Sequence, residues 1–229
     1  MGTLVALQPS FLPWRGFFDL IKKSDIFIFY DHVQYDKNGW RNRNRIIIQN
    51  KIKWLTVPVV HKNKDKILKD VKIFNPNTSL KKILRTIEIN YANHKNFEKF
   101  FPLLKKIILK KNANLNELNI ELILLICEYL NININYYRSS SFNNSKDKNL
   151  NLIKICRKFN CNRYLTGKLA LNYIDTPLFA RNNISIQWHD YKEKEYNQKN
   201  NNTKFFFEKI SIIDYIFNKG KNESKRKKI

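Results

Sequence analysis

The order of elements near the N-terminus constrains the fold most strongly. A strand-sized apolar run at residues 3–8 (TLVALQ) is followed by a helical stretch at 16–23 (GFFDLIKK) and by a second apolar run at 26–30 (IFIFY). Short apolar strands separated by a helix are typical of a βαβ unit, in which the strands run parallel and the crossover is right-handed. The sequence therefore predicts an α/β protein built on a mostly parallel sheet.

The remaining segments continue this pattern. Residues 44–59 (NRIIIQNKIKWLTVPV) predict two strands around a turn at 49–51, and so an antiparallel hairpin that extends or caps the sheet. Apolar residues recur at helical spacing from 78 to about 130. We further predict strands at 70–74, 163–167 and 184–188, a loop at 139–149, and helices at 151–159, from about Thr176, and at 210–218.

Length and composition favour one domain. The chain has 229 residues, 43% of them hydrophobic, which is enough for a single well-buried core. We predict one α/β domain over residues 1–219, with a mostly parallel central sheet, a β-hairpin extension and covering helices, and a disordered basic tail at 220–229. No apolar run is long enough to span a membrane, and no secretory signal is evident, so we expect a cytoplasmic protein.

The net charge allows two interpretations. The formal charge is +24, from 43 basic and 19 acidic residues, which suggests a polyanionic partner. However, the lysines are spread over nearly every segment, as expected for a lysine-rich composition without a dedicated surface. The cysteines, Cys127, Cys156 and Cys161, show no CxxC pairing, so we predict buried reduced thiols and no metal site.

Polar residues follow several of the predicted strands. In an open α/β sheet, ligands bind beyond the carboxyl ends of the strands. Gln8 and Pro9 end the first strand, Gly167 ends a later one, and the second strand leads into Asp31, His32 and Gln34, all of which are candidate site residues. A carboxylate beside a histidine can act as a general base, so Asp31 and His32 are the predicted catalytic pair. The alternative is an ordinary proline-bounded loop with a structural histidine.

An arginine row follows Trp40. Arg41, Arg43 and Arg45 alternate with Asn42 and Asn44, so in an extended segment the arginines share one face. Such a row suits a pyrophosphate or a carboxylate, because each guanidinium donates two parallel hydrogen bonds. We therefore predict that all six residues from Trp40 to Arg45 bind substrate; a solvated edge strand protected by charge is the alternative.

The start of the first helix resembles a nucleotide-binding turn. A strand, a proline-bounded loop, Gly16 at a helix start and a second strand ending in Asp31 are similar to the opening of the HxGH nucleotidyltransferases, where the helix N-terminus cradles phosphate. Trp14 and Phe17 stand where those enzymes have histidines, which argues against adenylyl transfer but leaves nucleotide binding open. Trp14 and Gly16 are accordingly predicted as binding residues.

Longer motifs resemble the WbqC-like protein family of bacterial polysaccharide and O-antigen gene clusters. The likeness is carried by residues 1–46, WLTVPV at 54–59, RYLTGKLALNYID at 163–175, the Trp-x-Asp-Tyr and Tyr-x-Gln patterns at 188–191 and 196–198, and ISIIDYIFNKG at 210–220. The family's recurring positions also map onto Pro13, Asp19, Tyr173, Tyr196 and Asp214.

The resemblance implies a transferase of surface-polysaccharide biosynthesis. Its expected partners are a nucleotide-linked amino sugar, whose amine is acylated with glycine or a similar group, and an activated acyl donor, with aminoacyl-tRNA among the possibilities. Two alternatives stay open, a noncatalytic scaffold and a tRNA-binding or other nucleic-acid-binding protein.

The sequence also departs from the family pattern. Many relatives carry a Trp and a His in the helix before Tyr91, where this chain has Ser79 and Ile83, and Lys168 and Leu169 follow Gly167 where relatives often have Pro and a small residue. If that His is a catalytic base, the activity of this chain is lost or altered.

Overall fold

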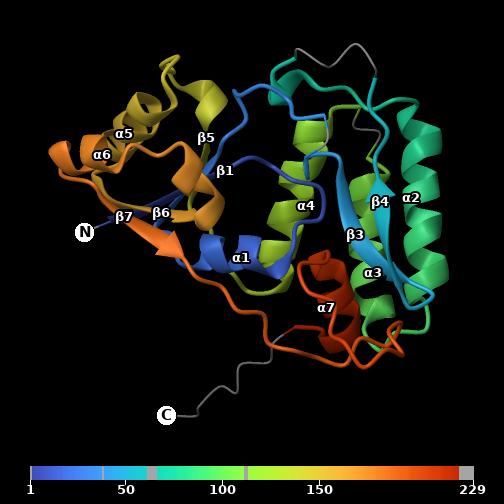
Figure 1. Cartoon of the computed structure of the whole chain (residues 1–229). Coiled ribbons are helices and arrows are strands. Elements are labelled where there is room, and N and C mark those ends of the chain that lie inside the picture. Colours follow the sequence, from blue (N-terminus) through green and yellow to red (C-terminus); the bar gives the residue numbers. More distant parts are fainter. Residues whose placement is uncertain (1, 38, 61–65, 111–112, 222–229) are drawn as a thin grey trace.

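The structure is a computed structural model and describes residues 2–37, 39–60, 66–110 and 113–221 (Figure 1). Most of the basic tail predicted at 220–229 lies outside the described residues.

The core of the fold is a parallel sheet of five strands in the order β5-β2-β1-β6-β7. These strands are β1 (Gly2–Leu7), β2 (Ile26–Phe29), β5 (Tyr136–Arg138), β6 (Cys161–Gly167) and β7 (Ser185–His189). Helix α1 (Arg15–Lys22) connects β1 to β2. The βαβ unit and the α/β fold predicted from the sequence are therefore confirmed.

Helices cover both faces of this sheet. On one face, Leu4, Ile28 and Tyr164 pack in a cluster with α5 (Lys148–Lys158) and α6 (Thr176–Arg181). On the other face, Val5 and Phe27 join a larger cluster with α1, α4 (Leu115–Tyr129) and α7 (Ile212–Lys219). Because both faces of the sheet are covered at its centre, the neighbouring strands β1 and β2 are almost entirely apolar, as is usual for parallel sheets.

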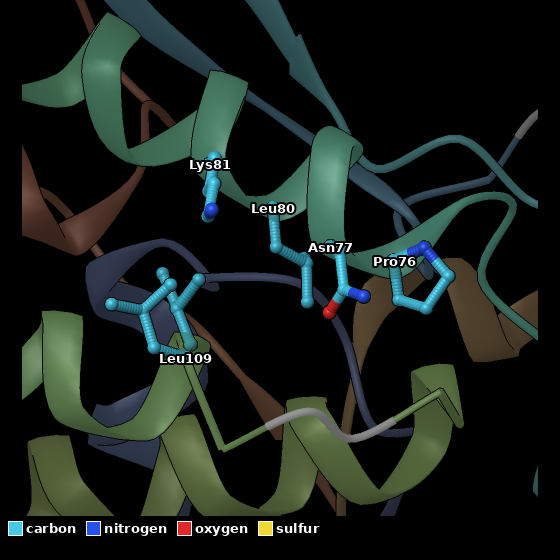
Figure 2. Close-up of a pocket in the computed structure, with 6 residues that line it drawn as sticks. Pro76, Asn77, Leu80, Lys81 and Leu109 are labelled. Atoms are coloured by element: carbon cyan, nitrogen blue, oxygen red, sulfur yellow. The ribbon is translucent and has the colours of Figure 1, made fainter.

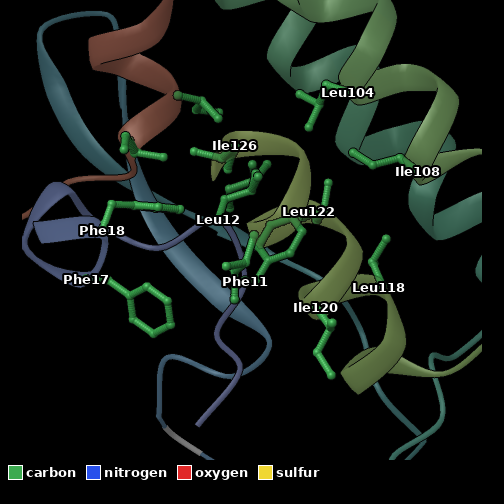
Figure 3. Close-up of a cluster of buried hydrophobic side chains, with 14 of the residues drawn as sticks. Phe11, Leu12, Phe17, Phe18, Leu104, Ile108, Leu118, Ile120, Leu122 and Ile126 are labelled. Carbon is green, nitrogen blue, oxygen red and sulfur yellow. The ribbon is translucent and has the colours of Figure 1, made fainter. Parts of the chain in front are cut away.

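The larger cluster continues into a helical layer beside the sheet. Helices α2 (Pro76–Tyr91), α3 (Phe97–Ile108) and α4 occupy the segment predicted as helical. The loop between β1 and α1 enters this layer, since Phe11 and Leu12 are fully buried near Leu118 and Leu122 of α4 (Figure 3). The packing of this layer thus fixes the position of the loop that follows the first strand.

Strands β3 (Arg43–Ile48) and β4 (Lys51–Thr56) form the predicted antiparallel hairpin. Gln49 and Asn50 at its turn have φ of 49° and 61°, the left-handed conformation that two-residue hairpin turns require. The hairpin is a separate two-stranded sheet beside α2 and α4 and does not extend the parallel sheet by hydrogen bonding (Figure 1).

One prediction of secondary structure was wrong, and one strand was not predicted. Residues 70–74 do not form a strand, because Lys72 and Ile73 make only isolated bridges, to Asn114 and Val59, after the 3₁₀ turn Leu68–Asp70. The sequence also gave no sign of β5, which has only three residues and an exposed face. The predicted loop at 139–149 starts with the 3₁₀ turn Ser139–Ser141 and ends in the first residues of α5.

Candidate functional site at the carboxyl edge of the sheet

The strand order reverses next to β1. From β1 the chain proceeds outward through α1 to β2 and β5, and then returns to add β6 and β7 on the other side. The loops that leave β1 and β6 therefore diverge, and ligands of open α/β sheets bind at such a point. Gln8 and Pro9 follow β1 and Gly167 ends β6, so the structure places these predicted residues at the switch point.

Gly167 leaves open space at this edge. Its φ of −72° and ψ of 156° are accessible to any residue, so the backbone does not require a glycine. A Cβ added to Gly167 would meet no atom within 4 Å. The register of β6 and β7 pairs Gly167 with His189, so the open space lies beside that histidine.

Buried asparagines hold the loop that leaves β1. The Asn44 amide donates to the carbonyl oxygens of Phe11 and Leu12, at 3.2 and 2.7 Å. The Asn119 amide of α4 donates to the Pro9 carbonyl oxygen at 3.3 Å. Leu12 has φ of 43°, a left-handed conformation that costs a leucine about 1–2 kcal/mol. The asparagines offset this cost, and Asn44, predicted to bind substrate, makes backbone contacts instead.

Of the predicted arginine row, Arg41 lies at the switch point. Its Nη1 donates to the Gln8 carbonyl oxygen at 3.1 Å. Burial lowers the pKa of Arg41 to about 10, although Asp36 opposes this effect, so the guanidinium still carries its charge at neutral pH. The neighbouring Asn42 amide donates to the Val57 carbonyl oxygen at 2.9 Å and fastens the hairpin.

The other two arginines lie on tryptophan rings. The Arg43 guanidinium is 4.4 Å from the ring centroid of Trp54, and that of Arg45 is 5.3 Å from the ring centroid of Trp40. Arg45 also donates to the Lys209 carbonyl oxygen at 2.9 Å. The row is therefore divided between the switch point and the hairpin.

Trp14 folds over the start of α1. A Cβ added to Gly16 would lie 2.3 Å from Cη2 of the Trp14 ring, so only glycine allows this close approach. Trp14 also makes an edge contact with Tyr191, with ring centroids 5.6 Å apart. The space beside Gly16 is thus filled by the protein, and these contacts are packing contacts.

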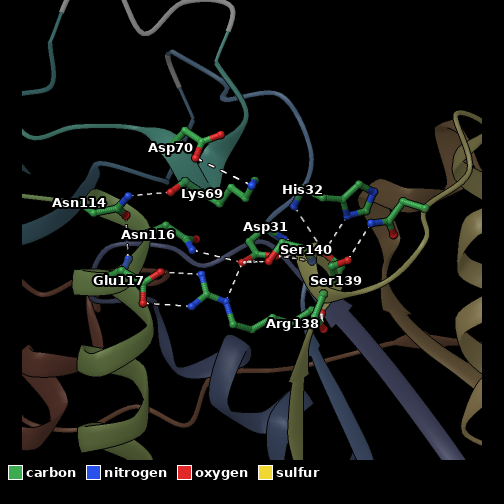
Figure 4. A network of polar contacts seen from close by, with 12 residues as sticks. Asp31, His32, Lys69, Asp70, Asn114, Asn116, Glu117, Arg138, Ser139 and Ser140 are labelled. Carbon is green, nitrogen blue, oxygen red and sulfur yellow. Dashed lines mark hydrogen bonds and ion pairs between the residues drawn. The ribbon is translucent and has the colours of Figure 1, made fainter.

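Asp31 lies at the centre of a buried polar network (Figure 4). Its Oδ2 accepts from Arg138 Nε at 2.9 Å and from Ser140 Oγ at 3.0 Å, and its Oδ1 accepts from the Ser140 amide at 2.8 Å and from Ser139 Oγ at 3.2 Å. Arg138 also holds Glu117 of α4 with two bonds, at 3.0 and 2.6 Å. Asp31 is fully buried, so this geometry makes it an anchor between the ends of β2 and β5.

The environment of His32 favours its neutral form. Nδ1 is 2.7 Å from Ser139 Oγ, and Nε2 is 3.3 Å from the Asn151 amide nitrogen. Because an amide NH₂ can only donate, Nε2 accepts and the proton sits on Nδ1. Burial lowers the pKa of His32, against the opposing charge of Asp31. Gln34, further along this loop, is exposed and pairs through its backbone with Ile67.

A second carboxylate–histidine pair was missed by the sequence reasoning. His189 Nε2 at the end of β7 lies 2.7 Å from Asp19 Oδ2 of α1, and its ring stacks on Tyr191 with centroids 5.8 Å apart. Burial opposes the ionisation of Asp19, but hydrogen bonds from His189 and Lys23 outweigh it and lower the pKa of Asp19. The available signal was that His189 directly follows the predicted strand 184–188.

Asp214 of α7 is fully buried beside the site and links three segments. It accepts from the Tyr196 hydroxyl at 2.7 Å and from the Tyr91 hydroxyl at 2.9 Å. Arg15 of α1 lies 5.0 Å from the ring centroid of Tyr196. Burial raises the pKa of Asp214 to about 6, from an ordinary value of 3.8, although the hydrogen bonds from both tyrosines oppose it.

We expect this aspartate to make stability depend on pH. The folded protein binds the Asp214 proton more tightly than the unfolded chain, so its contribution to stability is lost as the pH rises from 3.8 to about 6. Relative to Asp214→Asn, the wild-type protein should lose roughly 3 kcal/mol over this interval. Urea unfolding of both proteins at several pH values measures the difference, and a difference independent of pH would contradict the assignment.

The described structure also has a hollow of about 370 Å³ between α2 and α3 (Figure 2). It is lined by Pro76, Asn77, Leu80, Lys81, Ile108 and Leu109, none of which is a predicted site residue. Nearby on α2, Ser79 and Ile83 are buried, and Ser79 donates to the Phe74 carbonyl oxygen at 2.7 Å. Both positions therefore face the core.

The three cysteines are buried and form no disulfide, as predicted. Burial raises the pKa of Cys127 and of Cys156 to about 12, so both thiols are protonated at neutral pH. Within the described ranges, no helix is long and apolar enough to cross a membrane, and no cluster of His, Cys, Asp and Glu is arranged to hold a metal ion.

The fold and the switch point define a doubly wound α/β protein. The chain belongs to the WbqC-like protein family, which matches residues 8–226. It is 33% identical over 222 residues to the uncharacterized protein Rv1507c of Mycobacterium tuberculosis (strain ATCC 25618 / H37Rv), and the match covers 96% of this chain and 95% of that protein. No solved structure matches the chain.

Proposed function

We propose that the protein is a transferase of bacterial surface-polysaccharide biosynthesis that acylates the amine of a nucleotide-linked amino sugar. The observation that carries the nucleotide part is the open space at Gly167, at the point where the strand order reverses. The acyl-transfer part rests on the resemblance to the WbqC-like family.

The charge at the switch point suits a diphosphate. Arg41 supplies a partly buried positive charge beside the Gln8 carbonyl, and Lys168 follows Gly167 directly, although Lys168 is paired with Asp190 at 2.7 Å. A buried guanidinium binds phosphate more strongly than an exposed one, because water screens it less. Arg41 is therefore the proposed diphosphate ligand, and backbone amides near Gly167 would stabilise the oxyanion of the acyl-transfer step.

The proposed proton acceptor is His189. The sugar amine must lose a proton as it attacks the acyl carbonyl, and a base needs an accessible lone pair. Both Asp31 oxygens accept hydrogen bonds, and both ring nitrogens of His32 contact polar groups, those of Ser139 and Asn151. His189 is only 8% exposed but lies beside the open space at Gly167. Its Nε2 contacts Asp19, so Nδ1 would accept the proton and Asp19 would balance the positive charge that forms on the ring.

A melting-temperature assay tests the nucleotide site. A ligand at 100 times its dissociation constant stabilises a fold by about 2.7 kcal/mol, which is a shift of a few degrees. We expect that shift, at near-physiological salt, with nucleotide-linked amino sugars and not with the free sugars. The variant Gly167→Val should fill the open space and weaken binding about tenfold or more, equivalent to ~1.4 kcal/mol.

The unliganded Gly167→Val protein serves as its own folding control. The backbone at Gly167 accepts any residue and an added Cβ meets no atom within 4 Å, so the melting temperature of the variant should match that of the wild type. If a nucleotide-linked amino sugar raised the melting temperature of Gly167→Val as much as that of the wild type, the nucleotide would bind at another site. No shift with any nucleotide-linked sugar in the wild type would favour the noncatalytic scaffold.

A further inference from the structure

Two tryptophans of the hairpin region are exposed side by side. The side chain of Trp54 on β4 is 48% exposed, and that of Trp40, just before β3, is 38% exposed. Their ring centroids are 5.1 Å apart, with an angle of 49° between the planes. Exposed tryptophans in contact with each other form an apolar surface that a monomeric protein usually buries or uses for binding.

The two tryptophans and the arginines that contact them form what we call the Trp–Arg platform (Trp40, Trp54, Arg43 and Arg45). The guanidinium groups lie 4.4 and 5.3 Å from the ring centroids, within the range of cation–π contacts. These contacts hold each ring from one side and restrict its rotation. Asn44 anchors the hairpin to the loop after β1, and Asn42 joins the two ends of the hairpin through the Val57 carbonyl oxygen, so the platform has a fixed support.

The surroundings of the platform are basic. Arg43 and Arg45 lie on the same face of the hairpin as Trp54, the exposed Lys51 and Lys53 of β4 lie on the opposite face, and the whole chain carries a formal charge of +24. The platform itself contains no carboxylate, and carboxylates and amides are the groups that bind the hydroxyls of a neutral sugar. A partner that matches this surface has flat rings for stacking and a negatively charged backbone.

We propose that the Trp–Arg platform binds single-stranded nucleic acid. Bases would stack on Trp40 and Trp54, and the phosphates would lie along Arg43 and Arg45. Proteins that bind single strands combine aromatic stacking surfaces with a basic track in this way. The proposal concerns a different surface from the switch point and does not depend on the proposed transferase activity.

Fluorescence anisotropy with a short labelled oligouridine tests this site. Trp54→Ala should weaken binding about 5- to 150-fold, the range for losing one stacked base, whereas Trp54→Phe should retain most of the affinity. Trp40→Ala should act in the same direction and provides a second variant if Trp54→Ala folds poorly. The logarithm of the binding constant should fall linearly with that of the salt concentration, with a slope of about −0.7 per phosphate contacted.

Phe74→Ala is the matched control. Phe74 is 52% exposed just before α2 and is not part of the platform, so this variant removes a similar exposed aromatic surface and should bind like the wild type. Equal binding by the wild type, Trp54→Ala and Trp40→Ala would overturn the proposal. The proposal would also be overturned if dextran sulfate displaced the oligouridine equally well from the wild type and from Trp54→Ala. Binding would then depend on charge alone.

Discussion

Replacing Arg138 with methionine should destabilise the protein by about 3 kcal/mol at neutral pH, the lower end of the cost of breaking a buried ion pair, because Asp31 is buried but the Arg138 side chain is 33% exposed. Asp31 is fully buried and Arg138 Nε contacts its Oδ2 at 2.9 Å, so the variant leaves a buried carboxylate without this cation. Arg138 also contacts Glu117, so the link between β5 and α4 is lost as well.

Urea unfolding measures this effect, with Arg163→Met as the control. Arg163 is exposed on β6, and its replacement should change the free energy of unfolding by less than about 0.5 kcal/mol. Adding Asp31→Asn to Arg138→Met should recover part of the loss, because the buried charge is then removed. A loss below about 1 kcal/mol for Arg138→Met would show that the network is not a structural anchor.

Replacing His189 with glutamine should lower the turnover number by about 100- to 10,000-fold, the usual contribution of a general base, and leave sugar-nucleotide binding nearly unchanged. The reason is that glutamine can keep a hydrogen bond to Asp19 but cannot accept the amine proton. The measurement is the rate of acylation of whichever nucleotide-linked amino sugar stabilises the wild-type fold, followed by mass spectrometry. The melting-temperature shift with the same sugar reports binding.

His32→Gln is the comparison that separates the two candidate bases. If His189 is the base, this variant should retain turnover within about threefold, because His32 would only support the end of β2. A large loss in His32→Gln with normal turnover in His189→Gln would restore the catalytic role predicted from the sequence for the Asp31–His32 pair.

Most of the secondary structure could be predicted from the sequence, because each of these strands and helices follows from the pattern of apolar residues within its own segment. The apolar runs at 3–8 and 26–30 predicted β1 and β2, and the alternation around residues 49–51 predicted the hairpin. Strand β5 escaped prediction because three residues carry too little periodicity. Residues 70–74 were misassigned because alternating burial also occurs in an extended segment without a neighbouring strand.

Only part of the candidate site could be predicted from the sequence. The rule that ligands bind at the carboxyl ends of parallel strands located Gln8, Pro9 and Gly167, since it requires only the strands and their direction. It did not show that Asn44 clamps the Leu12 carbonyl, because that contact joins residues 32 positions apart.

By itself, the sequence determined the α/β class, the βαβ opening, the hairpin and the relationship to the WbqC-like family, all of which depend on patterns within short stretches of chain. Only the tertiary structure decided how the polar residues are used. It paired His189 with Asp19, 170 positions apart, buried Asp31 against Arg138, and divided the arginine row between the switch point and the tryptophans. The physical reason is that burial and hydrogen bonding depend on which distant segments pack together. The spacing of residues within one segment does not determine that packing.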